Sequence, residues 1–294
     1  MGDVKDKVVL ITGGARGIGA ETAKALAAKG AYVVLTDVEE GALKSVAAEI
    51  GDRALAVVAD VCDLSAMESA VAAGIERFGG IDVVVANAGI ASYGSVLNVD
   101  PATFRRVIDI NVNGVFHTVR AALPSMIERK GYILVVSSAA AFAPVPGMAS
   151  YNASKAATEH FTNALRLEVA HFGVDVGSAH MLWIDTPLVQ DAKKDLSAFT
   201  QMLESLPYPV GKTTSVDKCV TAFVKGIEGR ERRIYVPGWV GLLAKSRTLL
   251  NSRLGERDLR KSAPRLVPLM DEEVARLGRS TSARNVAPLT RAED

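Results

Sequence analysis

The sequence predicts an α/β fold in which short parallel strands alternate with helices. Apolar, β-branched runs recur along the chain, and stretches with apolar residues at helical spacing separate them. The first run, 7–12, passes through a glycine-rich turn directly into an alanine-rich helix, which is the order found in βαβ units. At 294 residues, the chain can bury a large core as one such domain or at most two small ones.

Composition argues against several classes of function. Hydrophobic residues make up 49% and charged residues 23% of the chain, as in ordinary globular proteins, and the net charge of +1 gives no general attraction to nucleic acid or membranes. The two cysteines, Cys62 and Cys219, lack metal-ligand spacing, and we expect reduced thiols rather than a disulfide. The first apolar run is too short for a signal peptide or a membrane span, so we expect a cytoplasmic protein.

The turn after the first strand has the spacing of a phosphate-binding site. It reads Thr12-Gly13-x-x-x-Gly17-x-Gly19. Gly13 permits the tight turn, Gly17 lets the backbone approach a pyrophosphate, and Gly19 lets the helix pack on the strand. The first amides of the helix, at about 20–29, then face the anion. The alternative is a glycine-rich turn that binds no ligand.

The second strand, 32–36, leads to Asp37, and its carboxylate bears on the choice of cofactor. A carboxylate here accepts hydrogen bonds from the ribose hydroxyls of an adenosine. It also repels a 2′-phosphate, by about 4 kcal/mol for charges about 4 Å apart at an effective dielectric constant of about 20. Arg16 would instead attract a 2′-phosphate. Because Asp37 lies where the ribose must lie, we expect NAD; alternatively, Asp37 caps a helix and Arg16 is a solvated charge.

The third strand, 54–58, follows a polar helix and is itself followed by Asp60 and Val61. In parallel sheets the ligand crevice lies at the carboxyl ends of the strands. This pair could therefore contact an adenine. The alternative is that Asp60 only caps the next helix, at 65–78.

The fourth strand, 83–86, ends in Asn87-Ala88-Gly89, where small residues let the backbone approach a ligand. One long helix is then predicted over 101–127, because apolar residues recur there at helical spacing. Asn111 lies inside this helix. A mid-helix asparagine normally points to solvent, so the residue taken alone predicts a surface position.

The stretch around Tyr151 carries the strongest chemical signal. The fifth strand, 132–136, has Ser138 at its carboxyl end, and a helix reaching to about residue 171 carries Tyr151 and Lys155. Residues four apart share one helix face, and a close ammonium lowers the pKa of a phenol. Alone, such a pair more often marks an amphipathic helix surface.

The remaining segments complete the alternation of strands and helices. We expect a sixth strand at 174–180, a helix near 216–227 and a last strand at 233–236. Between them, 186–209 mixes apolar with charged residues and resembles a mobile lid.

Taken together, these motifs resemble the short-chain dehydrogenase/reductase family in order and spacing, over about residues 5–240. The resemblance implies a doubly wound Rossmann fold with a mostly parallel seven-stranded sheet of order 3-2-1-4-5-6-7. It implies that Ser138 hydrogen-bonds the substrate oxygen and that Tyr151 exchanges its proton. Lys155 would lower the pKa of Tyr151 and bind the nicotinamide ribose. Asn111 would hold a water molecule that relays the proton.

The expected cofactor is NAD, and no metal is expected. Thr186 matches the family's threonine that contacts the carboxamide of the nicotinamide. The full set of expected cofactor-binding residues is Gly13, Arg16, Gly17, Ile18, Gly19, Asp37, Asp60, Val61, Asn87, Ala88, Gly89, Tyr151, Lys155, Ile184 and Thr186.

Two features depart from the family pattern. Met181-Leu182 stands after the sixth strand, where relatives usually carry Pro-Gly, and the bulkier residues could reshape the nicotinamide end of the pocket. The chain also continues past Gly238, where typical members stop. We therefore expect a domain over 1–238, including the lid, and an extension over 239–294 that is helical and then irregular.

The predicted activity is hydride transfer between NAD(H) and a secondary alcohol or ketone. Largely apolar residues are candidates for the pocket, which suggests a steroid-, terpene- or lipid-like substrate; equally, they could only pack the lid on the core. They are 139–148, Trp183, Leu188, Val189, Phe199 and Met202. Alternatives are an NADP-dependent ketone reductase, a nucleotide-binding scaffold without turnover, and a reductase of activated double bonds. Relatives of this last kind have a lysine where Thr158 stands.

A homodimer or homotetramer is the expected assembly, on the resemblance and on the apolar faces of the two long helices. The extension alternates apolar residues with basic ones, so it could lie on an anionic membrane. We favour packing on a neighbouring subunit or over the lid, because Pro264 and Pro268 are expected to break the apolar stripe.

Overall fold

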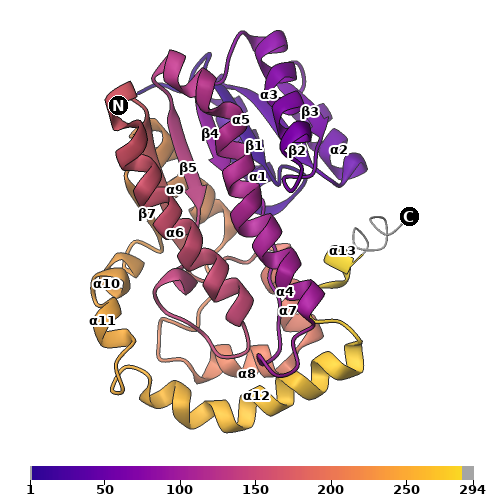
Figure 1. The fold of residues 1–294 in the computed structure, drawn as a ribbon, viewed down its shortest axis with the longest axis vertical. Helices are drawn as coiled ribbons and strands as arrows, with labels where there is room; N and C mark the ends of the chain where they lie inside the picture. The colour runs from indigo at the N-terminus through magenta and orange to yellow at the C-terminus, as the bar shows by residue number, and fades with distance from the viewer. Residues whose placement is uncertain (1, 287–294) are drawn as a thin grey trace.

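A computed structural model describes residues 2–286 and has the predicted parallel sheet at its centre (Figure 1). All neighbouring strands are parallel, and their order is β3-β2-β1-β4-β5-β6-β7. The strands are β1 (Val8–Thr12), β2 (Tyr32–Asp37), β3 (Ala54–Val58), β4 (Val83–Ala86), β5 (Tyr132–Val136), β6 (Asp175–Met181) and β7 (Arg233–Val236). The order reverses between β1 and β4, and ligands bind at such a switch point, outside the carboxyl ends of the strands.

Helices cover both faces of the sheet, because successive strand residues point to opposite sides. Val9 and Ile11 of β1 pack with α1, α2 and α9, whereas Val8 and Leu10 pack with α3, α5 and α6. These helices are α1 (Gly17–Ala28), α2 (Glu40–Ile50), α3 (Leu64–Phe78), α5 (Gly114–Arg129), α6 (Ala149–Val169) and α9 (Val216–Glu228). The central strands β1, β4 and β5 are therefore buried on both sides, as their continuous apolar runs predict.

The two alternatives in which Asp37 and Asp60 serve as helix caps are wrong. Asp37 is the last residue of β2, and Glu39 occupies the N-cap position of α2. Asp63, not Asp60, caps α3, since its carboxylate accepts hydrogen bonds from the amides of Ser65 and Ala66. Both Asp37 and Asp60 are thereby left at the ends of strands, facing the crevice.

The helix expected over 101–127 is interrupted. α4 (Pro101–Ile108) leads into a π-helical turn at Asp109–Asn113, and α5 follows. Asn111 lies in this turn and is fully buried, so the predicted surface position is wrong. A π-turn adds a residue to the helical repeat, which rotates the side chains after it, and such turns are frequent at functional sites.

The segment predicted as a lid forms two helices, α7 (Pro187–Asp195) and α8 (Ser197–Ser205). Beyond β7, the extension continues as α10 (Val240–Lys245), α11 (Arg247–Leu250), α12 (Arg257–Leu277) and α13 (Ala283–Val286). Figure 1 shows α12 running beneath α8 along the foot of the molecule. No helix among residues 2–286 has the length and apolarity needed to cross a membrane.

The expected break of the apolar stripe at Pro264 and Pro268 is wrong, because α12 runs through both. The two prolines lie four residues apart on the exposed face, where water can satisfy the carbonyls that lose a backbone partner. The opposite face stays continuous. Leu266, Met270 and Val274 recur at four-residue spacing and pack on the lid.

Candidate active site

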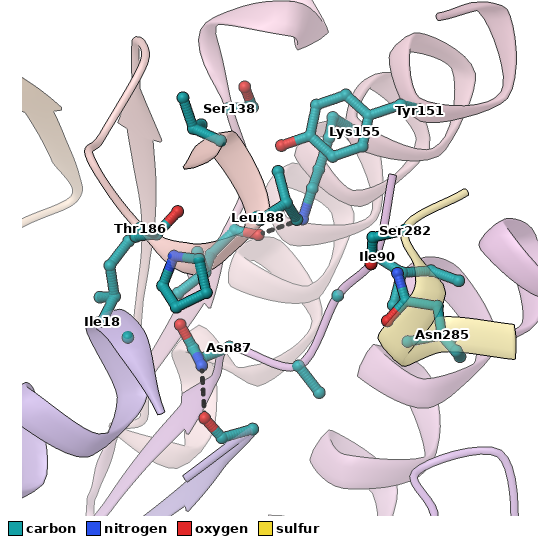
Figure 2. A pocket seen from close by; sticks show the side chains of 18 of the residues that line it. Ile18, Asn87, Ile90, Ser138, Tyr151, Lys155, Thr186, Leu188, Ser282 and Asn285 are labelled. Atoms are coloured by element: carbon teal, nitrogen blue, oxygen red, sulfur yellow. Dashed lines mark hydrogen bonds between the residues drawn. The ribbon is translucent and has the colours of Figure 1, made fainter. Parts of the chain in front are cut away.

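A cavity of about 340 Å³ lies at the carboxyl ends of the strands. Nearly every predicted site residue lines it, although these residues come from widely separated parts of the chain (Figure 2). Two predicted residues do not line it. Gly19 packs beneath the glycine-rich turn, and Asn111 lies behind the cavity wall.

The glycine-rich turn admits no larger residues. Gly13 and Gly17 have φ values of 68° and 58°, which L-residues with a β-carbon rarely adopt. A β-carbon on Gly19 would lie 2.2 Å from the carbonyl oxygen of Gly13, so the predicted packing role of Gly19 agrees with the geometry. Helix α1 begins here without a side-chain cap, which leaves its first amides free of a side-chain acceptor among the described residues.

Asn87 and Thr12 fasten the turn to the end of β4. The side-chain amide of Asn87 donates to the carbonyl oxygens of Thr12 and Gly13, at 2.9 and 3.2 Å. In return, the Thr12 hydroxyl accepts hydrogen bonds from the backbone amides of Asn87 and Ala88. The two cofactor motifs predicted from the sequence are therefore one rigid unit.

Acidic groups dominate the end of the cavity beside β2. The Asp37 carboxylate accepts hydrogen bonds from the amides of Ala15 and Glu39, both at 3.1 Å, and burial raises its pKa. Arg16 forms an ion pair with Glu39, so the interpretation of Arg16 as a solvated charge is wrong. Its positive charge is already balanced by a carboxylate.

Asp60 is held in place by Arg106, a residue that the sequence reading missed. The Arg106 guanidinium lies 3.0 Å from Asp60 Oδ2, and the amide of Cys62 donates to Oδ1 at 2.9 Å. Arg106, Asp60 and Val61 all line the cavity. No sequence signal singles out Arg106, because it is one of two adjacent arginines on a predicted helix.

Tyr151, Lys155 and Ser138 meet at the opposite end of the cavity, as predicted. Lys155 is 4% exposed, and its ammonium donates to the carbonyl oxygen of Val136 at 2.9 Å. The ammonium lies 5.6 Å from the centroid of the Tyr151 ring. Burial lowers the pKa of Lys155 to about 8.

The expected lowering of the Tyr151 pKa is wrong for this state of the protein. Withdrawal of the phenol from water raises the pKa of Tyr151, and the Ser138 side chain offsets only part of this rise. The Lys155 ammonium is directed to the Val136 carbonyl and forms no hydrogen bond with the phenol.

Asn111 connects the loop after β4 to α6. Its Oδ1 accepts from the amide of Ile90, and its Nδ2 donates to the Ile90 carbonyl and to the Ser154 hydroxyl, each at 2.9 Å. A β-carbon on Gly89 would come within 3.2 Å of Asn111 Oδ1 and 3.4 Å of Lys155 Nζ. Asn111 thus fixes the backbone beside Lys155, and its role in a proton relay stays a prediction.

Met181-Leu182 forms part of the cavity wall beside Ser138. The Ser138 hydroxyl donates to the Met181 carbonyl at 3.4 Å, and the amide of Leu182 donates to Val236 of β7 at 2.9 Å. Ile184 and Thr186 follow directly and also line the cavity. The departure from the usual Pro-Gly therefore keeps the predicted residues at the site.

Comparisons with known proteins agree with this geometry. The family described as short chain dehydrogenase matches residues 7–197. Trans-4-hydroxycyclohexanecarboxylate dehydrogenase from Sinomonas cyclohexanicum is 37% identical over 200 residues, covering 65% of this chain and 77% of that protein. A 3-alpha-(or 20-beta)-hydroxysteroid dehydrogenase from Mycobacterium bovis is 36% identical over 191 residues, covering 65% and 74%.

A solved structure extends the likeness beyond the matched segment. The 3-ketoacyl-(acyl-carrier-protein) reductase from Brucella melitensis, complexed with NADH, superposes with a TM-score of 0.72 at 32% identity. The superposition covers 79% of this chain and 97% of that one. Because the family match spans more than half of the chain and the fold agrees throughout the sheet, the chain belongs to the short-chain dehydrogenase family of oxidoreductases.

Proposed function

We propose that the protein transfers a hydride between NAD(H) and a secondary alcohol or ketone. The observation that supports this most directly is the convergence of Ser138, Tyr151 and Lys155 at one end of a cleft. The glycine-rich turn and Asp37 lie at the other end. A bound nicotinamide would supply or accept the hydride, while the protein would orient the reactants and move the proton.

The residues present fit a dinucleotide. The turn at Gly13 and Gly17 has no side chains that would block a pyrophosphate, and the uncapped start of α1 favours an anion. Asp37 is placed to accept ribose hydroxyls, and Arg16 is already paired with Glu39. This distribution of charge supports NAD over NADP, because a 2′-phosphate would meet two carboxylates and only one balanced cation.

Tyr151 is the proposed proton donor and acceptor. As a neutral phenol, Tyr151 would give its proton to a ketone oxygen, with the Ser138 hydroxyl beside it in the same cavity. In the oxidative direction the phenolate must form, and the buried Lys155 ammonium is the nearby charge that favours it.

An apolar substrate is supported by the wall next to Tyr151. Trp183, Leu188, Val189 and Phe199 line the cavity, whereas Met202 packs inside the lid cluster. Two relatives are named for a hydroxycyclohexanecarboxylate and for hydroxysteroids. Alicyclic secondary alcohols are therefore the first class to test.

The test is kcat/KM across alicyclic, linear apolar and polar secondary alcohols, with NAD and with NADP. We expect turnover with NAD, a preference for apolar alcohols, and a fall on the order of 10²-fold or more in Tyr151→Phe. NADH binding should persist in that variant, because its other cofactor contacts remain.

Tyr93→Phe is the matched control, since Tyr93 presents a second phenol to the same cavity. Its turnover should stay within a few-fold of wild type. More than a tenth of wild-type turnover in Tyr151→Phe would exclude this tyrosine as the acid/base. A wild-type preference for NADP would show that Arg16 outweighs Asp37.

A further inference from the structure

The last described residues return to the cleft after α12 ends. Gly278, at φ 64°, terminates α12 in a left-handed turn and reverses the chain. Ser282, Arg284 and Asn285 then line the same cavity as Tyr151 and the glycine-rich turn. Figure 2 shows Ser282 and Asn285 beside Ile90, across the cavity from Thr186. We name residues 279–286 the C-terminal strap.

Hydrogen bonds attach one side of the C-terminal strap to the loop after β4. The amide of Tyr93 donates to the Ser280 carbonyl at 2.7 Å, and the Thr281 hydroxyl donates to the Ala91 carbonyl at 2.8 Å. The amide of Asp100 donates to the Ser280 hydroxyl at 3.2 Å. Ser280 and Thr281 are buried, so this side is a fixed attachment.

Ion pairs attach the other side of the C-terminal strap to α7. The Arg284 guanidinium meets both carboxylate oxygens of Asp191, at 2.9 Å from Nε and 3.0 Å from Nη2. Arg279 lies 2.8 Å from Asp195. Asp191 and Asp195 are four residues apart on α7, so they present one acidic face to two arginines.

The C-terminal strap also presents polar atoms to the cavity. The side-chain amide of Asn285 donates to the Thr281 hydroxyl at 3.1 Å, which orients its carboxamide oxygen toward the cavity (Figure 2). Ser282 is largely buried, with its hydroxyl beside Ile90. The backbone of Ile90 is the segment that Asn111 holds.

We propose that the C-terminal strap is a wall of the cofactor and substrate site, and that the Arg284–Asp191 pair must open for ligand exchange. The identity of the ligand rests on the proposed function. The strap spans the cavity from the loop after β4 to α7, so detachment of one side widens the path by which a ligand leaves. The ionic side is the weaker one, because Arg284 is 41% exposed and such pairs are screened by salt.

The first experiment measures NADH dissociation from the full-length enzyme by stopped-flow fluorescence. Arg284→Gln and Asp191→Asn should each speed dissociation roughly threefold, within the range expected for one ion pair. The double variant should add little, because both changes remove the same contact. Added NaCl should speed release from wild type more than from either variant.

Arg276→Gln is the matched control. Arg276 lies in α12, also makes an ion pair, and does not line the cavity. Its NADH dissociation rate should equal that of wild type. Wild-type dissociation rates in both Arg284→Gln and Asp191→Asn would overturn the proposal.

The second experiment uses no cofactor, so it separates this inference from the proposed function. Stopping the chain after Gly278 should expose the amides of Tyr93 and Asp100 and raise their hydrogen exchange at least tenfold, while Arg276→Gln leaves them protected. Unchanged hydrogen exchange of these amides in the truncated chain would overturn the proposal that the C-terminal strap covers the loop after β4. Failure of wild type to bind either NADH or NADPH, with this exchange result obtained, would contradict only the proposed function.

Discussion

Lys155 shows how one residue connects stability with chemistry. Its ammonium is removed from water and keeps a single hydrogen bond, to the Val136 carbonyl. Burial of a charged ammonium with few hydrogen bonds costs free energy. For the same reason, burial lowers the pKa of Lys155 to about 8. The protein holds a destabilised charge next to Tyr151, and that is where a developing phenolate would be stabilised.

Substituting Lys155 by Met should therefore change how stability depends on pH. In the folded protein the pKa of Lys155 lies below its unfolded value of 10.5, so the unfolded chain binds the extra proton between pH 8 and 10.5. As the pH rises through this window, the free energy of unfolding of wild type relative to that of Lys155→Met should increase by about 3 kcal/mol. Below pH 8 the difference should stay constant. Urea unfolding at several pH values measures this difference.

A flat difference across that window would mean that Lys155 titrates normally in the folded state. Lys130→Met is a suitable control, since Lys130 is exposed and lies outside the cavity. The same urea unfolding of Lys130→Met gives the reference for removal of an exposed lysine.

At the scale of elements, the regular parts of the sheet follow directly from the sequence. The ranges 54–58, 83–86, 132–136 and 233–236 were predicted as they are found, because buried parallel strands are continuous apolar runs. The π-turn at Asp109–Asn113 was not predictable, since apolar spacing continues through it. Only contacts distant in sequence, such as Asn111 with Ser154, explain why the helix changes its repeat there.

The candidate site was predictable where local motifs define it. The spacing of Tyr151 and Lys155 and the position of Ser138 at a strand end drew attention to these residues, and the resemblance to the short-chain dehydrogenase/reductase family assigned their roles. Arg106 and the C-terminal strap were missed, because tertiary contacts bring them to the cavity and no motif marks them. The pKa of Tyr151 was mispredicted because helical spacing does not reveal that the Lys155 ammonium turns to Val136.

Glu273 is a buried polar contact between α12 of the extension and α8 of the lid. This residue of α12 is 4% exposed, and its carboxylate accepts hydrogen bonds from the amides of Ser197 and Ala198, both at 3.0 Å. The Ser197 hydroxyl donates to the same carboxylate at 2.5 Å. Since these are the first amides of α8, a side chain from another helix performs the capping role there.

Glu273→Ala should lower the free energy of unfolding by about 2–3 kcal/mol, because the buried amide of Ala198 and the partly buried amide of Ser197 lose a charged acceptor. Cleavage of the lid by trypsin under native conditions should also become faster, since α8 is less well held. Glu272→Ala is the matched control, being a glutamate on the exposed face of the same helix. If both variants unfold and are cleaved like wild type, Glu273 does not hold the lid.

At the scale of the whole molecule, the extension is divided between two environments. The second half of α12 packs on the lid through Leu266, Met270 and Val274. Toward the start of the extension, Leu242, Leu249 and Leu254 are exposed among basic side chains. The alternatives for the extension were a membrane surface, a neighbouring subunit and the lid. For the second half of α12, packing over the lid of the same chain is the one observed.

Assembly into a homodimer or homotetramer stays a prediction, and the structure offers a surface for it. Phe116 on α5, Leu167 on α6 and Phe172 just beyond α6 are exposed apolar residues on the two long helices. None of them belongs to the extension. An assembly that uses this surface would persist without residues 239–294.

Stopping the chain after Gly238 should reduce turnover of apolar alcohols by an order of magnitude or more, because the lid loses its support. The truncated chain loses the apolar cover of Phe199 and Met202 and the carboxylate that caps α8. The glycine-rich turn, Asp37 and Tyr151 are held by other elements, so NADH should still bind, although it should dissociate faster because the C-terminal strap is also removed. Sedimentation velocity of both chains at micromolar concentration should give a dimer or tetramer, whereas a monomeric full-length chain would contradict the assembly.

Three other outcomes of this truncation have definite meanings. Equal turnover in the two chains would show that the lid closes without the extension. Loss of the oligomer only in the truncated chain would move the interface to α10–α12 and away from Phe116 and Leu167. Co-sedimentation of only the full-length chain with anionic liposomes would assign the exposed leucines of the extension, and the arginines around them, to a membrane surface.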